Sequence, residues 1–442
     1  MYKYQRIARA IERNLPHYSH KLPTIRELAA EYGVTKTTIT NALKQLEAAH
    51  LIYSRQQSGY FLVDQAENLQ TTTGLFDFAN ASPEANHFPY HHFTGCIHQA
   101  LNTHKDDLFT YGQSQGFPPL IQSASKLLQA DQIFARPEHI FITSGAQQAL
   151  SILCQMPFPN SGDTILIESP TYPLFEQLAE LYNLTAIPIK RTKNGINLKA
   201  FNHLLNEHNV KFFYTIPRFH NPLGFSNTNA HNQTIADIAA THNTYIIEDD
   251  YLADLDTTNT QPLYAEAKTD HVIYLKSFSK VLFPGLRISV AVLPANLASS
   301  FHTYKQLTDI DSSLLPQIAL QLFVDNGMLS RHLDELRQHY STKLDLFQSI
   351  VADHPIHHDL PYLPPKSLKT HLPLPNHFNL RHLMKTCQEQ RILLPDNQLP
   401  GALDTAHIPL LLELSTIPLD TLEEATQHLL DIILTYLNRV GD

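Results

Sequence analysis

Residues 277–287, SFSKVLFPGLR, decide how most of this 442-residue chain is interpreted. Lys280 lies there in a mostly apolar context, in which an ammonium group loses its proton more readily and becomes a nucleophile able to form a Schiff base. Arg287 offers a guanidinium fork that suits a phosphate, and Ser277 and Ser279 add hydroxyl groups. A single lysine is more often a surface residue, so the interpretation depends on what surrounds this stretch.

On both sides of Lys280 in the sequence, apolar strand-like runs alternate with helical patterns. The runs are HIFITSG, DTILIES, NVKFFYTIP, TYIIEDD, HVIYLKSFS and RISVAVLP, at 139–145, 163–169, 209–217, 244–250, 271–279 and 287–294. This alternation predicts an α/β domain with a largely parallel or mixed sheet. The functional residues of such a sheet lie at the strand ends and in the loops that follow them.

Three of these loops offer groups that suit a flat, phosphorylated ligand. Gly145, Ala146 and Gln147 open a helix, whose first backbone N–H groups form an anion site. Tyr172 follows a Ser-Pro-Thr turn and can stack on a ring, although a lone tyrosine is more commonly a packing residue. Asn221, in the turn HNPLG, can donate its amide hydrogen to a phenolate.

A fourth loop begins with Glu248-Asp249-Asp250-Tyr251 at the end of an apolar strand. A carboxylate beside a pyridine nitrogen keeps that nitrogen protonated and makes the ring an electron sink. Asp249 is the first candidate for this role and Asp250 the second, whereas Tyr251 can bind a ring hydroxyl. The simpler alternative is that these acids only cap a helix.

In this order and spacing, the loops resemble those of the fold-type I aminotransferases, the family of aspartate aminotransferase, over roughly residues 76–442. The resemblance implies pyridoxal 5′-phosphate (PLP) as cofactor, with Lys280 as the aldimine lysine and Asp249 as the partner of the pyridine nitrogen. It also implies that Asn221 and Tyr251 bind the ring oxygen O3′. The remaining ligands that it implies are Gly145, Ala146, Gln147, Tyr172, Ser277, Ser279 and Arg287.

Two further positions concern the assembly and the substrate. Tyr111, in YGQSQGFPPL, matches a family tyrosine that reaches the phosphate held by the other subunit, which implies a homodimer with shared sites. Glu413, in LLELST, stands about where the family has an arginine that clamps the substrate carboxylate. Because carboxylates repel each other, Glu413 counts against amino-acid transamination, unless Arg381 or Arg391 takes the arginine's place. The effector expected instead is PLP itself, or an amine without a clamped carboxylate.

The first 63 residues differ in charge from the rest of the chain. They carry nine Lys and Arg against four Asp and Glu, a balance of +5, whereas the whole chain has a net charge of −10. A basic segment joined to an acidic remainder predicts a polyanionic partner for that segment alone, with chance clustering as the alternative. No run of apolar residues is long enough to span a membrane.

Three helices and a hairpin are expected in this basic segment. The first helix covers 7–15, the second begins at Thr24 with Glu27 in capping-box spacing, and Gly33 ends it. The third begins after Thr35. Two helices joined by so short a turn match a helix-turn-helix, and 51–63 read as two strands forming a wing.

The string LPTIRELAAEYGVTKTTITNALKQLEAAHLIYSRQQSGYFLV, residues 22–63, resembles the GntR class of bacterial winged-helix repressors, with departures at Thr35 and His50. The resemblance implies binding to double-stranded operator DNA, with the third helix in the major groove; a helical dimerisation module is the alternative. The residues expected to contact DNA are Arg26, Thr35, Lys36, Thr37, Thr40, Arg55, Ser58 and Gly59.

Joined in one chain, a winged helix (1–63), a polar linker (64–75) and an aminotransferase-like domain (76–442) resemble the MocR subgroup of bacterial regulators. The third segment is expected to have a large α/β part, about 105–300, and a small C-terminal α+β part, about 301–442. The resemblance implies a transcriptional regulator that senses PLP or an amine adduct of it. A working aminotransferase with an accessory winged helix is the alternative.

Composition adds expectations about location and metals. The three cysteines, Cys96, Cys154 and Cys387, are far apart, which suits a reducing cytoplasm. The 26 histidines are scattered and show no metal-ligand spacing, so no metal site is expected.

Overall fold

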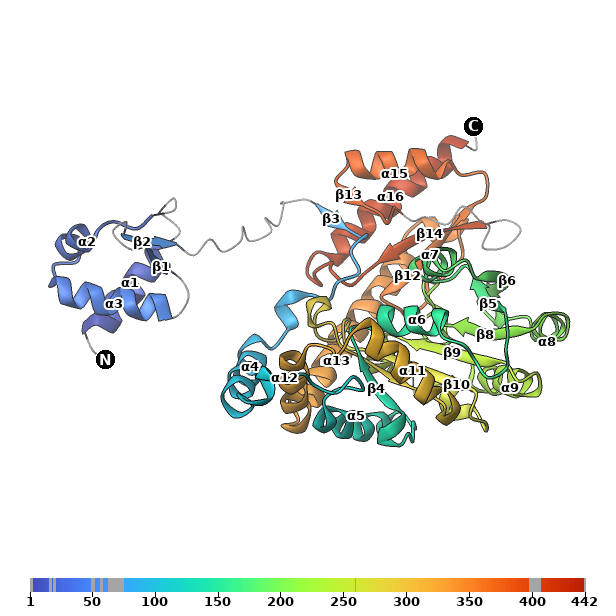
Figure 1. The fold of residues 1–442 in the computed structure, drawn as a ribbon. Helices are drawn as coiled ribbons and strands as arrows, with labels where there is room; N and C mark the ends of the chain where they lie inside the picture. Colours follow the sequence, from blue (N-terminus) through green and yellow to red (C-terminus); the bar gives the residue numbers. More distant parts are fainter. Residues whose placement is uncertain are drawn as a thin grey trace. The chain divides into compact units, whose positions relative to one another are not determined.

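The computed structural model describes residues 3–15, 18, 21–48, 52–55, 59–62, 75–258, 260–396 and 407–440. The chain divides into two compact units, residues 1–75, here called the head, and residues 76–442, here called the body (Figure 1). The predicted linker, apart from its last residue, and the wing tip at 56–58 lie outside the described residues.

The head consists of three helices and an antiparallel hairpin, as the sequence predicts. Its elements are α1 Lys3–Asn14, α2 Ile25–Glu31, α3 Lys36–Ala48, β1 Ile52–Arg55 and β2 Gly59–Leu62. The capping box forms, because Thr24 Oγ1 accepts the Glu27 N–H at 3.3 Å and the Glu27 carboxylate accepts the Thr24 N–H at 2.7 Å. Gly33 has φ of 62°, the left-handed conformation that ends a helix. Ile11, Leu28 and Leu43 are buried in the core between the helices.

The body is built on an eight-stranded sheet with the order β4-β11-β10-β9-β8-β5-β6-β7. The strands are β4 Ile140–Thr143, β5 Thr164–Ser169, β6 Thr185–Thr192, β7 Gly195–Ile196, β8 Val210–Thr215, β9 Tyr245–Asp250, β10 Val272–Ser277 and β11 Ser289–Val292. The sheet is mixed: β11 is antiparallel to β10 and β4, β7 is antiparallel to β6, and the other pairs are parallel. All six apolar runs form strands, whereas β6 and β7 were not predicted.

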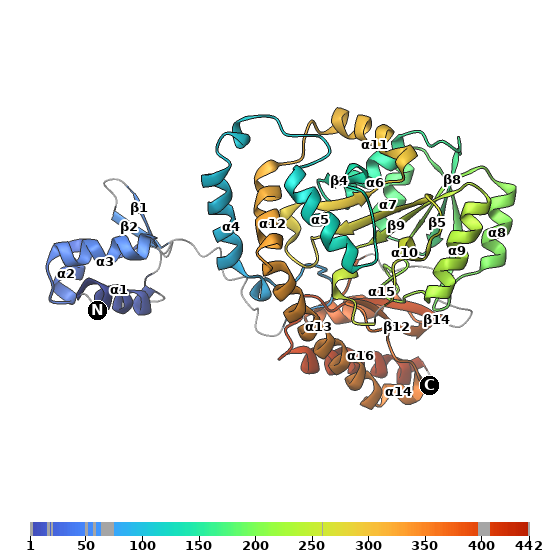
Figure 2. The ribbon, with the colours of Figure 1, turned by 90° about the horizontal axis from the view of Figure 1, so that it is seen from below.

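Helices cover both faces of this sheet (Figures 1 and 2). They are α4 Tyr90–Thr103, α5 Pro118–Ala130, α6 Ala146–Gln155, α7 Pro173–Leu181, α8 Leu198–Glu207, α9 Asn229–Thr241, α10 Leu263–Glu266, α11 Ala295–Thr308, α12 Leu314–Asp325 and α13 Met328–Asp353. Successive side chains of a strand point to opposite faces. Thus Ile165 and Ile167 pack with α6, α7 and α11, whereas Leu166 packs with α8, α9 and α10. A third cluster joins β4 and β11 to α4, α5, α12 and the first half of α13.

A separate core forms the small part of the body. Its elements are β3 Phe76–Asp77, α14 Ile356–Asp359, β12 Lys369–Pro375, α15 Leu380–Glu389, β13 Ile392–Leu393, β14 His407–Glu413 and α16 Leu422–Val440. The boundary predicted at about residue 301 is wrong, because Phe301 and Phe323 pack in the clusters of the large part. The small part instead begins within α13, near Phe347, and includes Phe76 and Phe78 from the other end of the body.

Short 3₁₀ helices complete the connections. They are η2 Ala85–His87, η3 Asp107–Phe109, η4 Pro137–His139, η5 Ala253–Leu255 and η6 Pro284–Leu286. Among the described residues, no helix is both long and apolar enough to cross a membrane. The three cysteines are free and buried.

Candidate functional site

A cavity of about 450 Å³ opens in the body at the carboxyl ends of the parallel strands, the position where open α/β sheets bind ligands. Both parts of the body contribute to its wall. The predicted cofactor ligands that line it are Ala146, Gln147, Tyr172, Asn221, Asp249, Tyr251, Ser277, Ser279, Lys280 and Arg287. Residues far apart in the sequence therefore meet at one site, in the arrangement that the loop positions predict.

One end of the cavity suits an anion. Gly145, with φ of 84°, is the N-cap of α6, and no side chain caps that helix end. A Cβ atom on Gly145 would lie 2.5 Å from Nη2 of Arg287, so the guanidinium occupies the space that a side chain at this position would take. Arg287 in turn donates to the Ser144 carbonyl at 3.0 Å. Free backbone N–H groups beside a guanidinium make a phosphate site.

The three consecutive acids of β9 have different roles. Asp249 lines the cavity, its Oδ2 accepts from the Tyr214 hydroxyl at 2.8 Å, and its buried Oδ1 has no hydrogen-bond partner among the described residues. Burial raises the pKa of Asp249 to about 6. A protonated ring nitrogen would supply the missing partner of Oδ1. Asp250 instead pairs with Arg218, and Glu248 accepts two backbone N–H groups at the start of α10.

Further polar and aromatic residues lie in the wall of the cavity. Asn221 is buried, and its Oδ1 lacks a hydrogen-bond partner within the described part of the chain. The Tyr251 hydroxyl donates to the Phe219 carbonyl at 3.0 Å. Gln147 donates to the Tyr172 hydroxyl at 3.1 Å, which fixes the aromatic ring in the cavity wall.

Lys280 lies between the two parts of the body. Its ammonium group donates to the carbonyl of Ala81, in a segment of the cavity wall that sequence reasoning missed. Burial lowers the pKa of Lys280, and the nearby Lys369 adds to this effect while Glu413 opposes it. A lowered pKa increases the share of neutral amine, which is the form that attacks a carbonyl.

Glu413 lies in the cavity wall, buried and ion-paired with Lys369. The two residues face each other across the antiparallel pair β12 and β14. Sequence reasoning identified Glu413 but missed Lys369, since strand pairing across 44 residues leaves no local signal. Neither Arg381 nor Arg391 lines the cavity.

A buried charged group behind the cavity was also missed. Glu168 accepts from Arg191 Nη1 at 2.7 Å and from the Ile216 N–H at 3.1 Å, and it lies 3.3 Å from His220 Nε2. Burial alone would raise the pKa of Glu168, but Arg191 and His220 outweigh it and hold this pKa at about 2. The group anchors the loop that carries Asn221.

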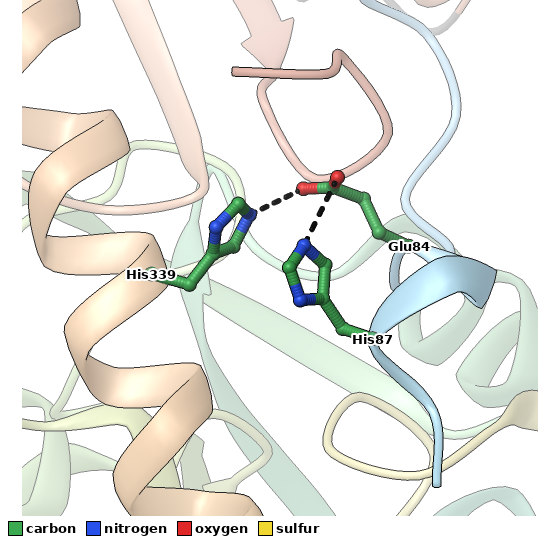
Figure 3. A group of neighbouring side chains, drawn as sticks. All are labelled: Glu84, His87 and His339. Carbon is green, nitrogen blue, oxygen red and sulfur yellow. Dashed lines mark hydrogen bonds and ion pairs between the residues drawn. The ribbon is translucent and has the colours of Figure 1, made fainter. Parts of the chain in front are cut away.

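Glu84, His87 and His339 meet beside the cavity wall (Figure 3). His339 Nε2 lies 2.8 Å from Glu84 Oε1, and His87 Nε2 lies 3.6 Å from Oε2. These are metal-ligating groups, but the buried ammonium of Lys343 contacts the same carboxylate and would repel a second cation. Lys343 also donates to the Ser415 carbonyl at 3.3 Å. The group therefore ties η2 to α13 and to the end of β14.

The other predicted positions lie outside the cavity. Tyr111 is 83% exposed and does not line it. In the head, Arg26, Thr35, Lys36, Thr37 and Gly59 are exposed. Thr40 is half-buried, and its hydroxyl donates to the Lys36 carbonyl at 3.0 Å. Ser58 and the side chain of Arg55 lie outside the described residues.

Comparison with known proteins assigns each unit to a family. Residues 84–424 match the family described as aminotransferase class I and II. The body resembles the kynurenine aminotransferase of Pyrococcus horikoshii with a TM-score of 0.74 and 24% identity, over 84% of this chain and 94% of that one. The α-aminoadipate aminotransferase LysN of Thermus thermophilus gives 0.73 and 23%, over 85% and 96%. The body is thus an aminotransferase class I and II domain of fold type I.

The head matches a second family. Residues 3–62 match the gntR family of bacterial regulatory proteins. YcxD of Bacillus subtilis, described as an uncharacterized HTH-type transcriptional regulator, is 45% identical over 357 residues, which are 79% of this chain and 80% of YcxD. The chain belongs to the GntR family and is a MocR-type transcriptional regulator, in which a DNA-binding head is joined to an aminotransferase-like body.

Proposed function

We propose that this regulator binds PLP in the cavity of the body, with Lys280 Nζ as the nucleophile that holds it, and changes its DNA binding when PLP or an amine reaches that site. The observation that carries the proposal is the buried Oδ1 of Asp249, which has no hydrogen-bond partner among the described residues. Asp249 lines the same cavity as Lys280 and Arg287, and Arg287 lies beside Gly145 at the start of α6. When bound, PLP supplies an aldehyde that reacts with amines and a ring that accepts electrons.

Each residue then has one task. Asp249 holds a proton on the ring nitrogen, while Asn221 and Tyr251 orient the ring through O3′ and Tyr172 stacks on it. The phosphate is held by backbone N–H groups and side chains at the end of the cavity. These are Gly145, Ala146, Gln147, Ser277, Ser279 and Arg287.

The head supplies the DNA contacts in this proposal. Lys36 and Thr37, exposed in the first turn of α3, enter the major groove, and Arg26 and Arg55 contact phosphates. A ligand alters DNA affinity only if it binds two arrangements of the protein unequally. The reacting lysine lies where the two parts of the body meet, so occupancy of the cavity can favour one arrangement of these parts.

A homodimer completes the assembly that we propose. Phe109, Tyr111, Leu307 and Ile310 are 93%, 83%, 83% and 60% exposed. They lie together, because the Gly112 N–H donates to Asp311 and so joins their two segments. An apolar patch of this kind is covered when a second copy binds, and Tyr111 would then face the partner's cavity. Sedimentation velocity should show that Phe109→Asp weakens the dimer.

A working aminotransferase is the less favoured function. Glu413 and Lys369 neutralise each other in the cavity, so the described residues of the wall present no unpaired cation to a substrate carboxylate besides the groups assigned to PLP. The effector that fits this wall is PLP or another vitamin B6 form, or a small amine.

The test of the proposal is a spectroscopic titration of the purified protein with PLP. A new visible absorbance band is expected, and after reduction with sodium borohydride, mass spectrometry should find phosphopyridoxyl-Lys280. Lys280→Ala should lose both signals, whereas Lys199→Ala, an exposed position on α8, should keep them. A label on other lysines, with none on Lys280, would reject the assignment.

A further inference from the structure

Among the described residues of the cavity wall, one ion pair has no role in the proposed binding of PLP. Lys369 and Glu413 form an ion pair, and their side chains are only 16% and 4% exposed. Glu413 lies close enough to Lys280 and Tyr251 to act on the pKa of each. The pair therefore borders the space in which an amine would meet Lys280 or the cofactor that Lys280 holds.

We propose that Lys369 is a carboxylate-binding cation masked by Glu413, so that the cavity accepts amines without a carboxylate beside the reacting nitrogen and rejects α-amino acids. The inference rests on the proposed function, because it names the class of amine that the PLP site takes. It assigns the selectivity to two residues that face each other on β12 and β14.

Few other cations are available to an incoming carboxylate. Of the described residues that line the cavity, the cationic ones are Lys280, Arg287 and Lys369. Lys280 is the nucleophile, and Arg287 lies at the anion end, bound to the Ser144 carbonyl. A ligand carboxylate near Lys280 would therefore have to pair with Lys369.

Pairing with Lys369 has a large cost in this protein. The ligand would have to separate Lys369 from Glu413 and leave that carboxylate buried without its cation, which is strongly unfavourable. It would also place two carboxylates side by side. An amine that carries a hydrogen or an alkyl group at this position leaves the pair intact. The intact pair thus favours the decarboxylated form of an amino acid over the amino acid itself.

Because Glu413 neutralises Lys369, a single substitution of Glu413 should change which ligands the cavity accepts. Glu413→Gln keeps the size of the side chain but removes its charge, so Lys369 becomes available to a ligand carboxylate. A charge-assisted bond to an ammonium group is expected to improve binding about tenfold or more. Adding Lys369→Gln to Glu413→Gln should abolish this gain, since the cation itself is then missing.

The experiment compares matched ligands on the PLP-loaded protein. Tyrosine and tyramine, and lysine and cadaverine, differ only in the carboxylate, and each is titrated while the visible spectrum is recorded. The wild type should respond to tyramine at a concentration at least about tenfold lower than to tyrosine. Glu413→Gln should gain its response to tyrosine with little change for tyramine, and the double variant should lose the gain.

Two results would overturn the inference. One is an equal response of the wild type to tyrosine and to tyramine, a comparison that does not depend on the folding of any variant. The other is a gain in Glu413→Gln that persists in the double variant. A calorimetric titration of cofactor-free protein with propanoate, which has no amine, tests Lys369 separately from PLP. Propanoate should bind more tightly to Glu413→Gln than to the wild type, even if PLP fails to bind at Lys280. Equal binding to the two proteins would reject the assignment of Lys369 as a carboxylate-binding cation masked by Glu413.

Discussion

Asp249 and Asp250 are neighbours with the same side chain, yet their surroundings give them different roles. Asp249 faces the cavity with one oxygen that has no hydrogen-bond partner in the described part of the chain, whereas Asp250 binds Arg218 and the Tyr274 hydroxyl, the latter at 2.8 Å. The loop pattern predicted an acid at this position and ranked Asp249 first, but it left Asp250 open as the second candidate. The choice between them depends on which face of β9 meets the cavity, and that is a property of the whole sheet.

Substituting each acid should therefore give a different defect. Asp249→Asn is expected to weaken PLP binding by at least about tenfold, because the ring nitrogen loses the carboxylate that keeps it protonated. Asp250→Asn should instead lower the melting temperature, since the buried Arg218 then keeps only Asp256, at 3.5 Å, as an acidic partner. Titration with PLP and thermal unfolding measure the two effects. The same defect in both variants would contradict the assignment of the ring partner to Asp249.

Gly145 allows a second test at the scale of one residue. In Gly145→Ala the new Cβ would meet Arg287 Nη2, and the φ of 84° is unfavourable for alanine. We expect PLP to bind at least about tenfold more weakly. Pyridoxal without the phosphate should bind almost as before. The control is Gly95→Ala in α4, where a Cβ meets no atom within 4 Å. An equal loss for both ligands would mean that the glycine does not serve the phosphate.

At the scale of elements, the apolar runs predicted six strands because those strands are buried on both faces. The strand β6 was missed because one of its two buried positions is a charged residue, Arg191, and Pro188 interrupts the apolar pattern. The boundary of the small part was misplaced because α11, α12 and the first half of α13 pack in the clusters of the large part before the chain enters the second core. Contacts such as Lys369 with Glu413 depend on strand register, which no local pattern encodes.

The helix α3 leads to a prediction about DNA binding. Lys36→Ala should weaken binding and reduce the slope of log affinity against log salt by about one, because it removes one cation from the DNA interface. Thr37→Ala should weaken binding with less change in salt dependence. Thr40→Ala should have a small effect, because its hydroxyl already donates to the Lys36 carbonyl. Fluorescence anisotropy at two salt concentrations, with a DNA duplex selected from a random pool, measures all three. A Thr40→Ala defect as large as that of Lys36→Ala would contradict this order.

At the scale of the whole molecule, buried ionisable groups act in opposite directions on stability. The pKa of Glu248 is raised to about 8, mainly by burial, so the folded state gains stability as the pH falls below that value. Burial lowers the pKa of His220, His332 and His371, and these groups remove stability as the pH falls below 6.5. The dependence of the unfolding free energy on pH is the sum of these opposite contributions. A variant that removes one titrating group therefore isolates its contribution better than the wild type alone.

His371 gives the sharpest test of this balance. It is fully buried between the Leu223 carbonyl, 2.9 Å from Nδ1, and the Tyr362 hydroxyl, 2.8 Å from Nε2. Burial lowers its pKa from 6.5 to about 4, so the unfolded chain binds more protons than the folded protein in that range. Between pH 7 and 5, this one group should remove about 2 kcal/mol of unfolding free energy.

His371→Gln keeps a donor and an acceptor but cannot be protonated, so its stability should fall by about 2 kcal/mol less than that of the wild type between pH 7 and 5. Urea unfolding at the two pH values measures the difference, whatever the substitution costs at pH 7. The control is His203→Gln, an exposed position on α8, which should follow the wild type. If His371→Gln also follows the wild type, then His371 is not neutral in the folded protein, and the closed packing of the small part against the loop at Leu223 does not hold in solution.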